Sequence, residues 1–274
     1  TGKHTMAHGY GKTALVTGAS SGIGRELATV FAEHGYNLVV VARNADALQT
    51  LAEELYDAYG TTVTVLPKDL SKPSAPQQIF KAVRAGGIHI DVLANNAGFG
   101  AFRGFAATPL SRVTGMIAVN VAALTELCHL FAGPMIEQRE GRILNVASVA
   151  SFNPTPNAAV YGATKAFVLS LSEALSEELK PHNITVTALC PGLTETGFSK
   201  AATGKTGANP AVPDFMKLDA KQVAREGFDA LHAGEVIKIN GIAYQLGVEW
   251  LRHAPRFMAR TVGGMFGKQL EDGF

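Results

Sequence analysis

The stretch that decides the fold is Thr13-Ala14-Leu15-Val16-Thr17-Gly18-Ala19-Ser20-Ser21-Gly22-Ile23-Gly24, in which an apolar run leads directly into a glycine-rich turn. Glycines permit a tight turn between a strand and a helix, and they let the backbone approach a ligand closely. The free N–H groups at the start of the following helix favour an anion such as a pyrophosphate. We therefore predict a strand–turn–helix unit that binds a dinucleotide, with contacts from Gly18, Ser20, Ser21, Gly22, Ile23 and Gly24.

The rest of the chain alternates short β-branched runs with longer helical patterns, which is typical of repeated βαβ units. Strands are expected at 13–17, 37–42, 62–66, 91–95, 142–147, 185–189 and 236–239. Helices are expected at 23–34, 44–59, 74–85, 108–134, 157–180 and 219–233. Several strands are almost continuously apolar, as strands covered on both faces are. The pattern predicts an α/β doubly wound Rossmann fold of about seven mostly parallel strands, with helices on both faces.

We find no linker or repeat, so residues 1–274 are expected to form a single domain that binds the dinucleotide and carries catalysis. Residues 1–11 are interpreted as an N-terminal tail, 194–217 as a substrate lid and 244–274 as a C-terminal extension. Gly35, Gly60 and Gly86 each follow a helical pattern, where a left-handed C-terminal cap is expected.

Composition excludes several classes of protein. The chain has 274 residues, of which 47% are hydrophobic and 17% charged, so it is not disordered. Its net charge of +1 shows no basic excess for binding nucleic acid. Two cysteines, Cys128 and Cys190, lack metal-ligand spacing, so we predict no metal site and two free thiols in the cytoplasm. We find no run of about 18 apolar residues that would span a membrane and no apolar core of a signal peptide at the start.

The end of the second predicted strand indicates which dinucleotide binds. An acidic residue at this place would hold the ribose 2′-OH of NAD. Here the strand ends in Ala42-Arg43, and the first acid after it is Asp46. The guanidinium of Arg43 suits a 2′-phosphate, although a solvated arginine at a helix start is the alternative. We predict NADP(H) in preference to NAD(H).

Three further segments follow in order: Asn95-Asn96-Ala97-Gly98, Asn145-Val146-Ala147-Ser148 and Tyr161-Gly162-Ala163-Thr164-Lys165. Together with the glycine-rich turn, they resemble the TGxxxGxG, NNAG, strand-end serine and YxxxK motifs of the short-chain dehydrogenase/reductase superfamily. The resemblance covers about residues 12–240. Within the superfamily, Tyr161–Phe167 and Ser170–Leu175 resemble the bacterial DltE-like branch of reductases.

Tyr161 and Lys165 carry the expected chemistry. They are four residues apart, so on a helix both side chains project from one face. A free tyrosine has a pKa of about 10, and a neighbouring ammonium favours its phenolate. We predict Tyr161 as the acid/base. An ordinary amphipathic pair is the alternative for these two residues.

Ser148 is expected at the carboxyl end of a strand, where open α/β sheets bind ligands. Its hydroxyl could hold a substrate carbonyl, although it could also cap a helix, and Ser151 competes for the role. The resemblance implies that Asn120 anchors a water in a proton relay. A buried structural role is the alternative for Asn120. The predicted catalytic set is Asn120, Ser148, Tyr161 and Lys165.

The resemblance also implies further contacts to the cofactor. Asp69, beside Leu70, corresponds to the acid that binds the adenine amino group. Asn96, Ala97 and Gly98 correspond to the segment along the adenosine ribose, and Tyr161 and Lys165 also contact the cofactor, Lys165 at the nicotinamide ribose. The nicotinamide end is expected to be bound by Pro191, Gly192 and Thr196.

Aromatic residues suggest an apolar wall for the substrate, made of Phe99, Phe102, Phe152, Pro154, Phe198 and Phe215. The stretch 248–270 mixes apolar and basic residues. A membrane-surface helix is one interpretation of this stretch, and a helix packed on its own subunit or on an oligomer contact is the favoured one. The resemblance implies a homodimer or homotetramer.

The prediction for function is an NADP(H)-dependent oxidoreductase that transfers a hydride between the nicotinamide and a small-molecule carbonyl or secondary alcohol. The alternative is a catalytically silent NADP(H)-binding sensor or scaffold. A binding module has no need of Asn120, Ser148, Tyr161 and Lys165 together, and this favours the enzyme.

Overall fold

The computed structural model describes residues 8–195, 216–255, 257–258, 260–261 and 263–264. Seven strands form one sheet in which every neighbouring pair is parallel. Their order across the sheet is β3 (Val63–Pro67), β2 (Asn37–Ala42), β1 (Thr13–Thr17), β4 (Val92–Asn95), β5 (Gly141–Val146), β6 (Ile184–Cys190) and β9 (Ile237–Ile239). The predicted doubly wound Rossmann fold is confirmed.

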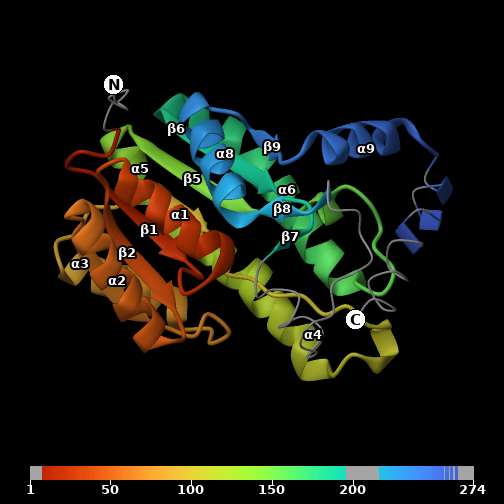
Figure 1. Cartoon of the computed structure of the whole chain (residues 1–274), viewed down its shortest axis with the longest axis horizontal. Coiled ribbons are helices and arrows are strands. Elements are labelled where there is room, and N and C mark those ends of the chain that lie inside the picture. Colours follow the sequence, from red (N-terminus) through yellow and green to blue (C-terminus); the bar gives the residue numbers. More distant parts are fainter. Residues whose placement is uncertain (1–7, 196–215, 256, 259, 262, 265–274) are drawn as a thin grey trace.

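Helices cover both faces of the sheet (Figure 1). One face carries α1 (Gly22–Glu33), α2 (Ala45–Tyr59) and α8 (Ala220–Ala233). The other carries α3 (Ala75–Ala85), α5 (Leu124–Gln138) and α6 (Ala159–Leu179). Successive strand residues alternate between the two cores: Ala14 and Val16 belong to the first, and Leu15 belongs to the second. This alternation is why β1 has no polar face.

All seven predicted strands lie within one residue of the observed bounds. Two additional short strands, β7 (Thr194–Glu195) and β8 (Leu218–Asp219), form a separate parallel pair. They lie at the two borders of the segment 196–215, which is outside the described residues. Short 3₁₀ helices lie at Phe105–Ala107, Val149–Ser151 and Lys180–His182.

Two of the three predicted glycine caps are left-handed. Gly35 has a φ of +83° and Gly60 has a φ of +68°. The prediction for Gly86 is wrong, since its φ is −77°, and the left-handed residue is Gly87 with a φ of +63°. The helix α3 ends at Ala85, as predicted, but the Gly86 N–H still bonds to the carbonyl of Ala82, so the left-handed residue comes one position later.

The long helix before β5 contains an irregular middle. It begins as α4 (Leu110–Ile117), passes through a π-helical segment (Ala118–Ala123) and continues as α5. The stretch Leu110–Gln138 has the length and composition of a membrane-spanning helix, with a mean hydropathy of 1.5 in its most apolar window. Its apolar residues Leu124, Leu127 and Phe131 pack in the core against the sheet, as those of a core helix do.

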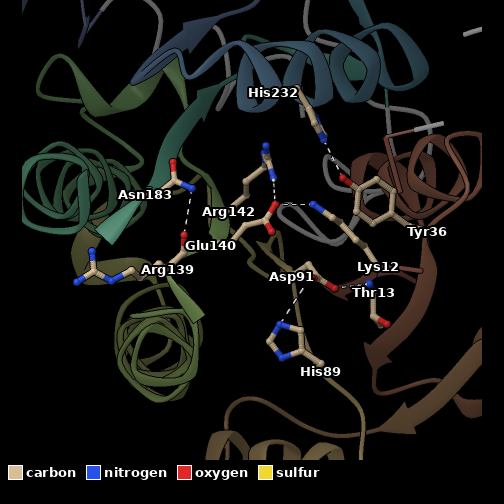
Figure 2. A network of polar contacts seen from close by, with 10 residues as sticks. All are labelled: Lys12, Thr13, Tyr36, His89, Asp91, Arg139, Glu140, Arg142, Asn183 and His232. Carbon is tan, nitrogen blue, oxygen red and sulfur yellow. Dashed lines mark hydrogen bonds and ion pairs between the residues drawn. The ribbon is translucent and has the colours of Figure 1, made fainter. Parts of the chain in front are cut away.

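A polar network holds the amino ends of the strands together (Figure 2). Lys12 before β1 pairs with Glu140 before β5, at 2.5 Å, and Arg142 also pairs with Glu140. Asp91 accepts a hydrogen bond from the Thr13 N–H at 2.7 Å. These contacts join β1, β4 and β5 at the edge opposite the carboxyl ends of the strands.

Candidate active site

A cavity of about 1220 Å³ opens at the carboxyl ends of the central strands. Parallel α/β sheets bind ligands at this edge, at the point where the strand order reverses. In this sheet the reversal lies between β1 and β4. Most of the predicted site residues line it together: Gly18, Ser20, Ser21, Gly22, Ile23, Arg43, Asp69, Leu70, Asn96, Ala97, Gly98, Ser148, Tyr161, Lys165, Pro191 and Gly192. Of the others, Thr196 lies outside the described residues, while Gly24 and Asn120 lie behind the cavity wall.

The glycine turn lines one end of this cavity. Gly18 and Gly22 have φ values of +69° and +54°, which side chains rarely allow. Ser21 is the N-cap of α1, and its side chain makes no capping hydrogen bond, so first-turn N–H groups of the helix stay available. An uncapped helix N-terminus with a glycine cradle fits the phosphates of a dinucleotide.

The side chain of Asn96 holds the glycine turn through hydrogen bonds to its backbone. Its side-chain amide donates to the carbonyl oxygens of Thr17 at 3.0 Å and Gly18 at 3.3 Å. The Thr17 hydroxyl accepts from the N–H groups of Asn96 and Ala97, each at 3.0 Å. Gly24 packs in the same place, since a Cβ on it would lie 2.3 Å from the Asn96 amide nitrogen. Asn96 and Gly24 therefore hold the turn in shape.

The end of the cavity beside β2 and β3 carries both signs of charge. Arg43 is exposed, and it lines the cavity with Lys68, which the sequence analysis did not single out. Asp69 accepts a hydrogen bond from the Ser71 N–H at 3.0 Å. The hydrogen bonds from Ser71, with a smaller contribution from the charge of Arg43, lower the pKa of Asp69. Asp69 is an ionised acceptor beside two cationic side chains.

The predicted catalytic side chains meet at the opposite end. Tyr161 and Lys165 are buried on α6, and the Lys165 ammonium lies 5.9 Å from the centre of the Tyr161 ring. The Lys165 Nζ donates to the carbonyl of Val146 at 2.6 Å, which fixes the side chain at the end of β5. Ser148 donates a hydrogen bond to the Tyr161 hydroxyl. Ser148 and Tyr161 are hydrogen-bonded to each other, and Lys165 lies beside the Tyr161 ring.

Burial sets the protonation of this group. Desolvation raises the pKa of Tyr161 to about 12, although the hydrogen bond from Ser148 opposes the rise. Desolvation lowers the pKa of Lys165 to about 8. Both shifts favour the neutral forms, because a charge loses hydration in the interior. At neutral pH the arrangement holds a protonated tyrosine hydroxyl, which is a proton donor.

Ser148 also starts the short helix Val149–Ser151. Its hydroxyl accepts from the Ala150 N–H at 3.1 Å, so the capping role weighed for this serine is present together with the contact to Tyr161. Ser151 donates to the carbonyl of Lys165 at 2.9 Å and faces the backbone. Of the two serines, only Ser148 lines the cavity.

Asn120 is fully buried in the π-helical segment. Its amide oxygen accepts from the Phe99 N–H at 3.1 Å, and its amide nitrogen donates to the Phe99 carbonyl and to the Thr164 hydroxyl, both at 3.0 Å. A Cβ on Gly98 would lie 3.1 Å from the Asn120 oxygen and 3.4 Å from the Lys165 Nζ. Asn120 thus lies near Lys165 behind the cavity wall and positions that wall through its bonds to Phe99.

The substrate end of the cavity is apolar. Phe99, Phe102 and Pro154 line it as expected, and the Phe102 ring meets the Tyr161 ring edge-on at 5.9 Å. The prediction for Phe152 is wrong, because this side chain packs against the core on the α3/α5/α6 face. Phe198 and Phe215 lie outside the described residues.

The C-terminal extension supplies part of the wall, a role that the sequence analysis missed. The helix α9 (Ile242–His253) places Tyr244, Val248 and Leu251 along the cavity. The Tyr244 hydroxyl donates to the carbonyl of Met216 at 2.9 Å and accepts from the Leu193 N–H at 3.0 Å. The recurrence of apolar residues three and four apart was the available signal for a packed face.

Comparison with known proteins accounts for this site. Residues 12–206 match the family model described as short chain dehydrogenase. The chain belongs to the short-chain dehydrogenase family. This membership makes it an NAD(P)-dependent oxidoreductase of small molecules, in agreement with the dinucleotide turn and the YxxxK pair. The finer resemblance to the DltE-like branch stays a prediction.

Three relatives represent the family. A very-long-chain 3-oxoacyl-CoA reductase of Phaeosphaeria nodorum is 34% identical over 223 residues, or 79% of this chain, which spans 64% of that reductase. A short-chain dehydrogenase from Sphingobium yanoikuyae in complex with NADPH has a TM-score of 0.78 and 34% identity, covering 88% of this chain and 93% of its own. A short-chain dehydrogenase/reductase from Burkholderia phymatum in complex with NAD has a TM-score of 0.76 and 28% identity, covering 88% and 92%.

Proposed function

We propose that the protein is an NADP(H)-dependent oxidoreductase that interconverts a carbonyl and a secondary alcohol on a bulky, largely apolar substrate, with Tyr161 as the acid/base. The observation that carries the proposal is the group of Ser148, Tyr161 and Lys165 on the wall of the cavity that holds the dinucleotide turn. When bound, the nicotinamide supplies or accepts the hydride.

The residues of the chain itself orient the substrate and transfer the proton. The Ser148 hydroxyl can turn from Tyr161 toward a substrate carbonyl oxygen and hold it beside the phenol. The protonated Tyr161 then donates its proton to that oxygen during reduction, and in the reverse direction the phenolate accepts the proton of the alcohol. Lys165 stabilises the phenolate by its charge, and Asn120 keeps the wall at Phe99 in place.

The preference for NADP(H) rests on the charges beside β2. Arg43 and Lys68 both line the adenosine end of the cavity, and the first acid after β2 is Asp46, which does not line it. Two cations at this place favour a ribose phosphate over a ribose hydroxyl. The NADPH complex of the Sphingobium yanoikuyae relative supports this choice, while the Burkholderia phymatum relative shows that the family also accommodates NAD.

The substrate class follows from the wall opposite Tyr161. Phe99, Phe102, Pro154, Val248 and Leu251 present apolar surface around the reacting centre. Apolar walls with a few polar anchors bind apolar ligands through burial of their surface. The long acyl chain in the name of the fungal reductase is consistent with this proposal. We further propose a single catalytic domain, a cytoplasmic location that suits two buried free thiols, and a homodimer or homotetramer.

The experiment that tests the proposal combines cofactor binding with turnover. We expect NADPH to bind at least about tenfold more tightly than NADH, by fluorescence titration, because a hydrogen bond between charged groups contributes about 1.5–3 kcal/mol. Arg43→Ala and Lys68→Ala are expected to weaken NADPH binding while leaving NADH binding unchanged. Equal affinities of the unchanged chain for the two cofactors would show that Arg43 and Lys68 do not select NADP(H).

Turnover is followed as NADPH oxidation with a panel of bulky aryl and long-chain ketones. Tyr161→Phe removes the proton donor and is expected to lower kcat at least about 100-fold while cofactor binding is kept. If the unchanged protein binds NADPH but reduces none of these ketones, the silent sensor becomes the better description. If Tyr161→Phe retains full activity, the assignment of the acid/base is wrong.

A further inference from the structure

The helix α9 has two faces with different surroundings. Its inner face, with Tyr244, Val248 and Leu251, lines the cavity. Figure 1 shows α9 at the end of the molecule far from α2 and α3, beyond β9. This position leaves the outer face of α9 without a covering element among the described residues. The cavity wall and the outer surface are thus two sides of one helix.

The outer face is a stripe of large apolar side chains. Ile242, Leu246 and Trp250 recur at intervals of four residues, so they lie along one side of the helix. Their exposed fractions are 75%, 67% and 55%. Phe257, just after α9, is 60% exposed. Solvent-exposed apolar residues are ordinary when scattered singly, but a continuous stripe indicates a surface that binds something.

The charges around this stripe are mostly basic. Residues 242–264 contain Arg252, Arg256 and Arg260 against a single acid, Glu249. Glu249 is itself paired, with Arg252 at 3.7 Å and with His253 at 3.1 Å. This stretch therefore carries a formal charge of +2, while the whole chain carries +1, so the other residues together carry −1. The net positive charge of the chain therefore comes from the stretch of sequence that contains the exposed apolar stripe.

We infer that the outer face of α9 docks on an anionic lipid surface. An apolar stripe with a tryptophan, flanked by arginines, has the composition of a helix that lies in the plane of a membrane interface. A second copy of the chain is a poorer occupant, because a symmetric contact would bring the arginines of one copy against those of the other. Docking would place the apolar wall of the cavity next to the phase into which apolar carbonyl compounds partition. The inference about docking is independent of the proposed reaction.

Trp250 is the only tryptophan of the chain, so its emission reports on this face alone. The full chain is mixed with vesicles of phosphatidylcholine, or of phosphatidylcholine with phosphatidylglycerol, and vesicles are recovered by flotation. We expect co-flotation and a blue shift of Trp250 emission with the mixed vesicles, both weaker with phosphatidylcholine alone and at high salt. Absence of flotation, or equal binding to both lipid compositions at any salt concentration, would overturn the inference.

Matched variants locate the contact. Leu246→Glu is expected to lower the partition coefficient at least about tenfold, because it removes an exposed leucine that the lipid would bury and adds a negative charge. Tyr56→Glu, on α2, changes a residue of similar exposure (66%) and is expected to bind vesicles like the unchanged protein. NADPH binding by both variants checks that they fold. Unchanged vesicle binding by folded Leu246→Glu, or a blue shift that grows with protein concentration in the absence of lipid, would contradict docking on lipid.

Discussion

Tyr161 and Lys165 are both buried, and burial shifts their pKa values in opposite directions, away from each other. Desolvation raises the pKa of Tyr161 to about 12 and lowers that of Lys165 to about 8. A proton donor for a carbonyl reduction needs the hydroxyl form, which this environment holds throughout the neutral range. The reverse reaction needs the phenolate, whose population rises tenfold per pH unit below the pKa. As the proposed acid/base, Tyr161 would therefore give the two directions different pH dependences.

We predict that kcat/KM for ketone reduction changes little between pH 6 and about 8, because Tyr161 stays protonated there. We predict that kcat/KM for alcohol oxidation increases with pH over the same range. Initial rates in both directions, measured in one constant-ionic-strength buffer series, check this. An oxidation rate independent of pH would argue against Tyr161 as the base, and Tyr161→Phe provides the baseline.

Some residues could be assigned from sequence and others could not. The YxxxK spacing places Tyr161 and Lys165 on one helix face, so their proximity was predictable. The way Asn96 holds Gly18 depends on a contact between β4 and β1, and no local pattern encodes it. The packing of the partly buried Phe152 against the core depends on how the chain leaves the short helix after Ser148, which the periodicity of the sequence does not report.

At the scale of elements, the turn between β1 and α1 works as one unit with the end of β4. The Thr17 hydroxyl and the Asn96 amide connect the two segments across the sheet. Gly24 lies in the first turn of α1 with no room for a side chain, since both the Asn96 amide nitrogen and the Gly18 carbonyl would be 2.3 Å from a Cβ. The shape of the phosphate cradle thus depends on a residue that does not line the cavity.

We predict that Gly24→Ala weakens NADPH binding at least about tenfold, because a methyl group at this position must displace Asn96 or the Gly18 carbonyl. Isothermal titration with NADPH measures the effect. Gly133→Ala in α5 is the matched control, since nothing lies within 4 Å of a Cβ there, and it is expected to bind NADPH normally. Equal affinities of the two variants would mean that the cradle tolerates the shift.

The bounds of the strands were predicted well because both faces of each strand are covered. The strands are apolar runs covered on both faces, so their bounds follow from composition to within one residue. The π-helical segment Ala118–Ala123 was not predictable from the sequence. It contains Asn120, whose side chain bonds to Phe99 and Thr164, and such tertiary contacts leave no local sequence pattern. The role of α9 in the cavity was missed for the same reason: an amphipathic pattern shows that a face is buried but not what it covers.

At the scale of the whole molecule, the two edges of the sheet serve separate purposes. The carboxyl edge carries the cavity, and the amino edge carries the polar network of Figure 2. At the amino edge the Tyr36 hydroxyl lies 2.9 Å from the His232 Nε2, and the His232 Nδ1 lies 2.8 Å from the Phe228 carbonyl. With Nδ1 protonated and donating, Nε2 accepts from Tyr36, so the neutral ring is the form that fits.

The stability of the fold is predicted to fall as the solution is acidified from about pH 6.5 to about pH 4. Burial lowers the pKa of His232 to about 4 in the folded chain, while the unfolded chain keeps an ordinary value near 6.5. Between these values the unfolded state binds more protons, so stability decreases as pH decreases. Urea denaturation across this range measures it.

A matched variant separates His232 from other acid-sensitive groups. His232→Gln keeps a polar side chain in place but cannot titrate, so the decline in stability between pH 6.5 and 4 should be shallower than in the unchanged chain. His253→Gln, at an 80% exposed side chain on α9, is the control and should leave the slope unchanged. Identical slopes for the unchanged chain and His232→Gln would contradict the assignment.

The separation of the two edges has a consequence for how this protein can be altered. Substitutions at distant sites with no shared partners add in their effects on stability. Changes at Glu140 or Arg142 that raise the melting temperature should therefore combine freely with changes at Phe102 or Leu251 that broaden the range of ketones accepted. A laboratory selection for new substrates could first introduce stabilising substitutions at the amino edge and then tolerate destabilising substitutions at the carboxyl edge. This makes the scaffold a favourable starting point for directed evolution.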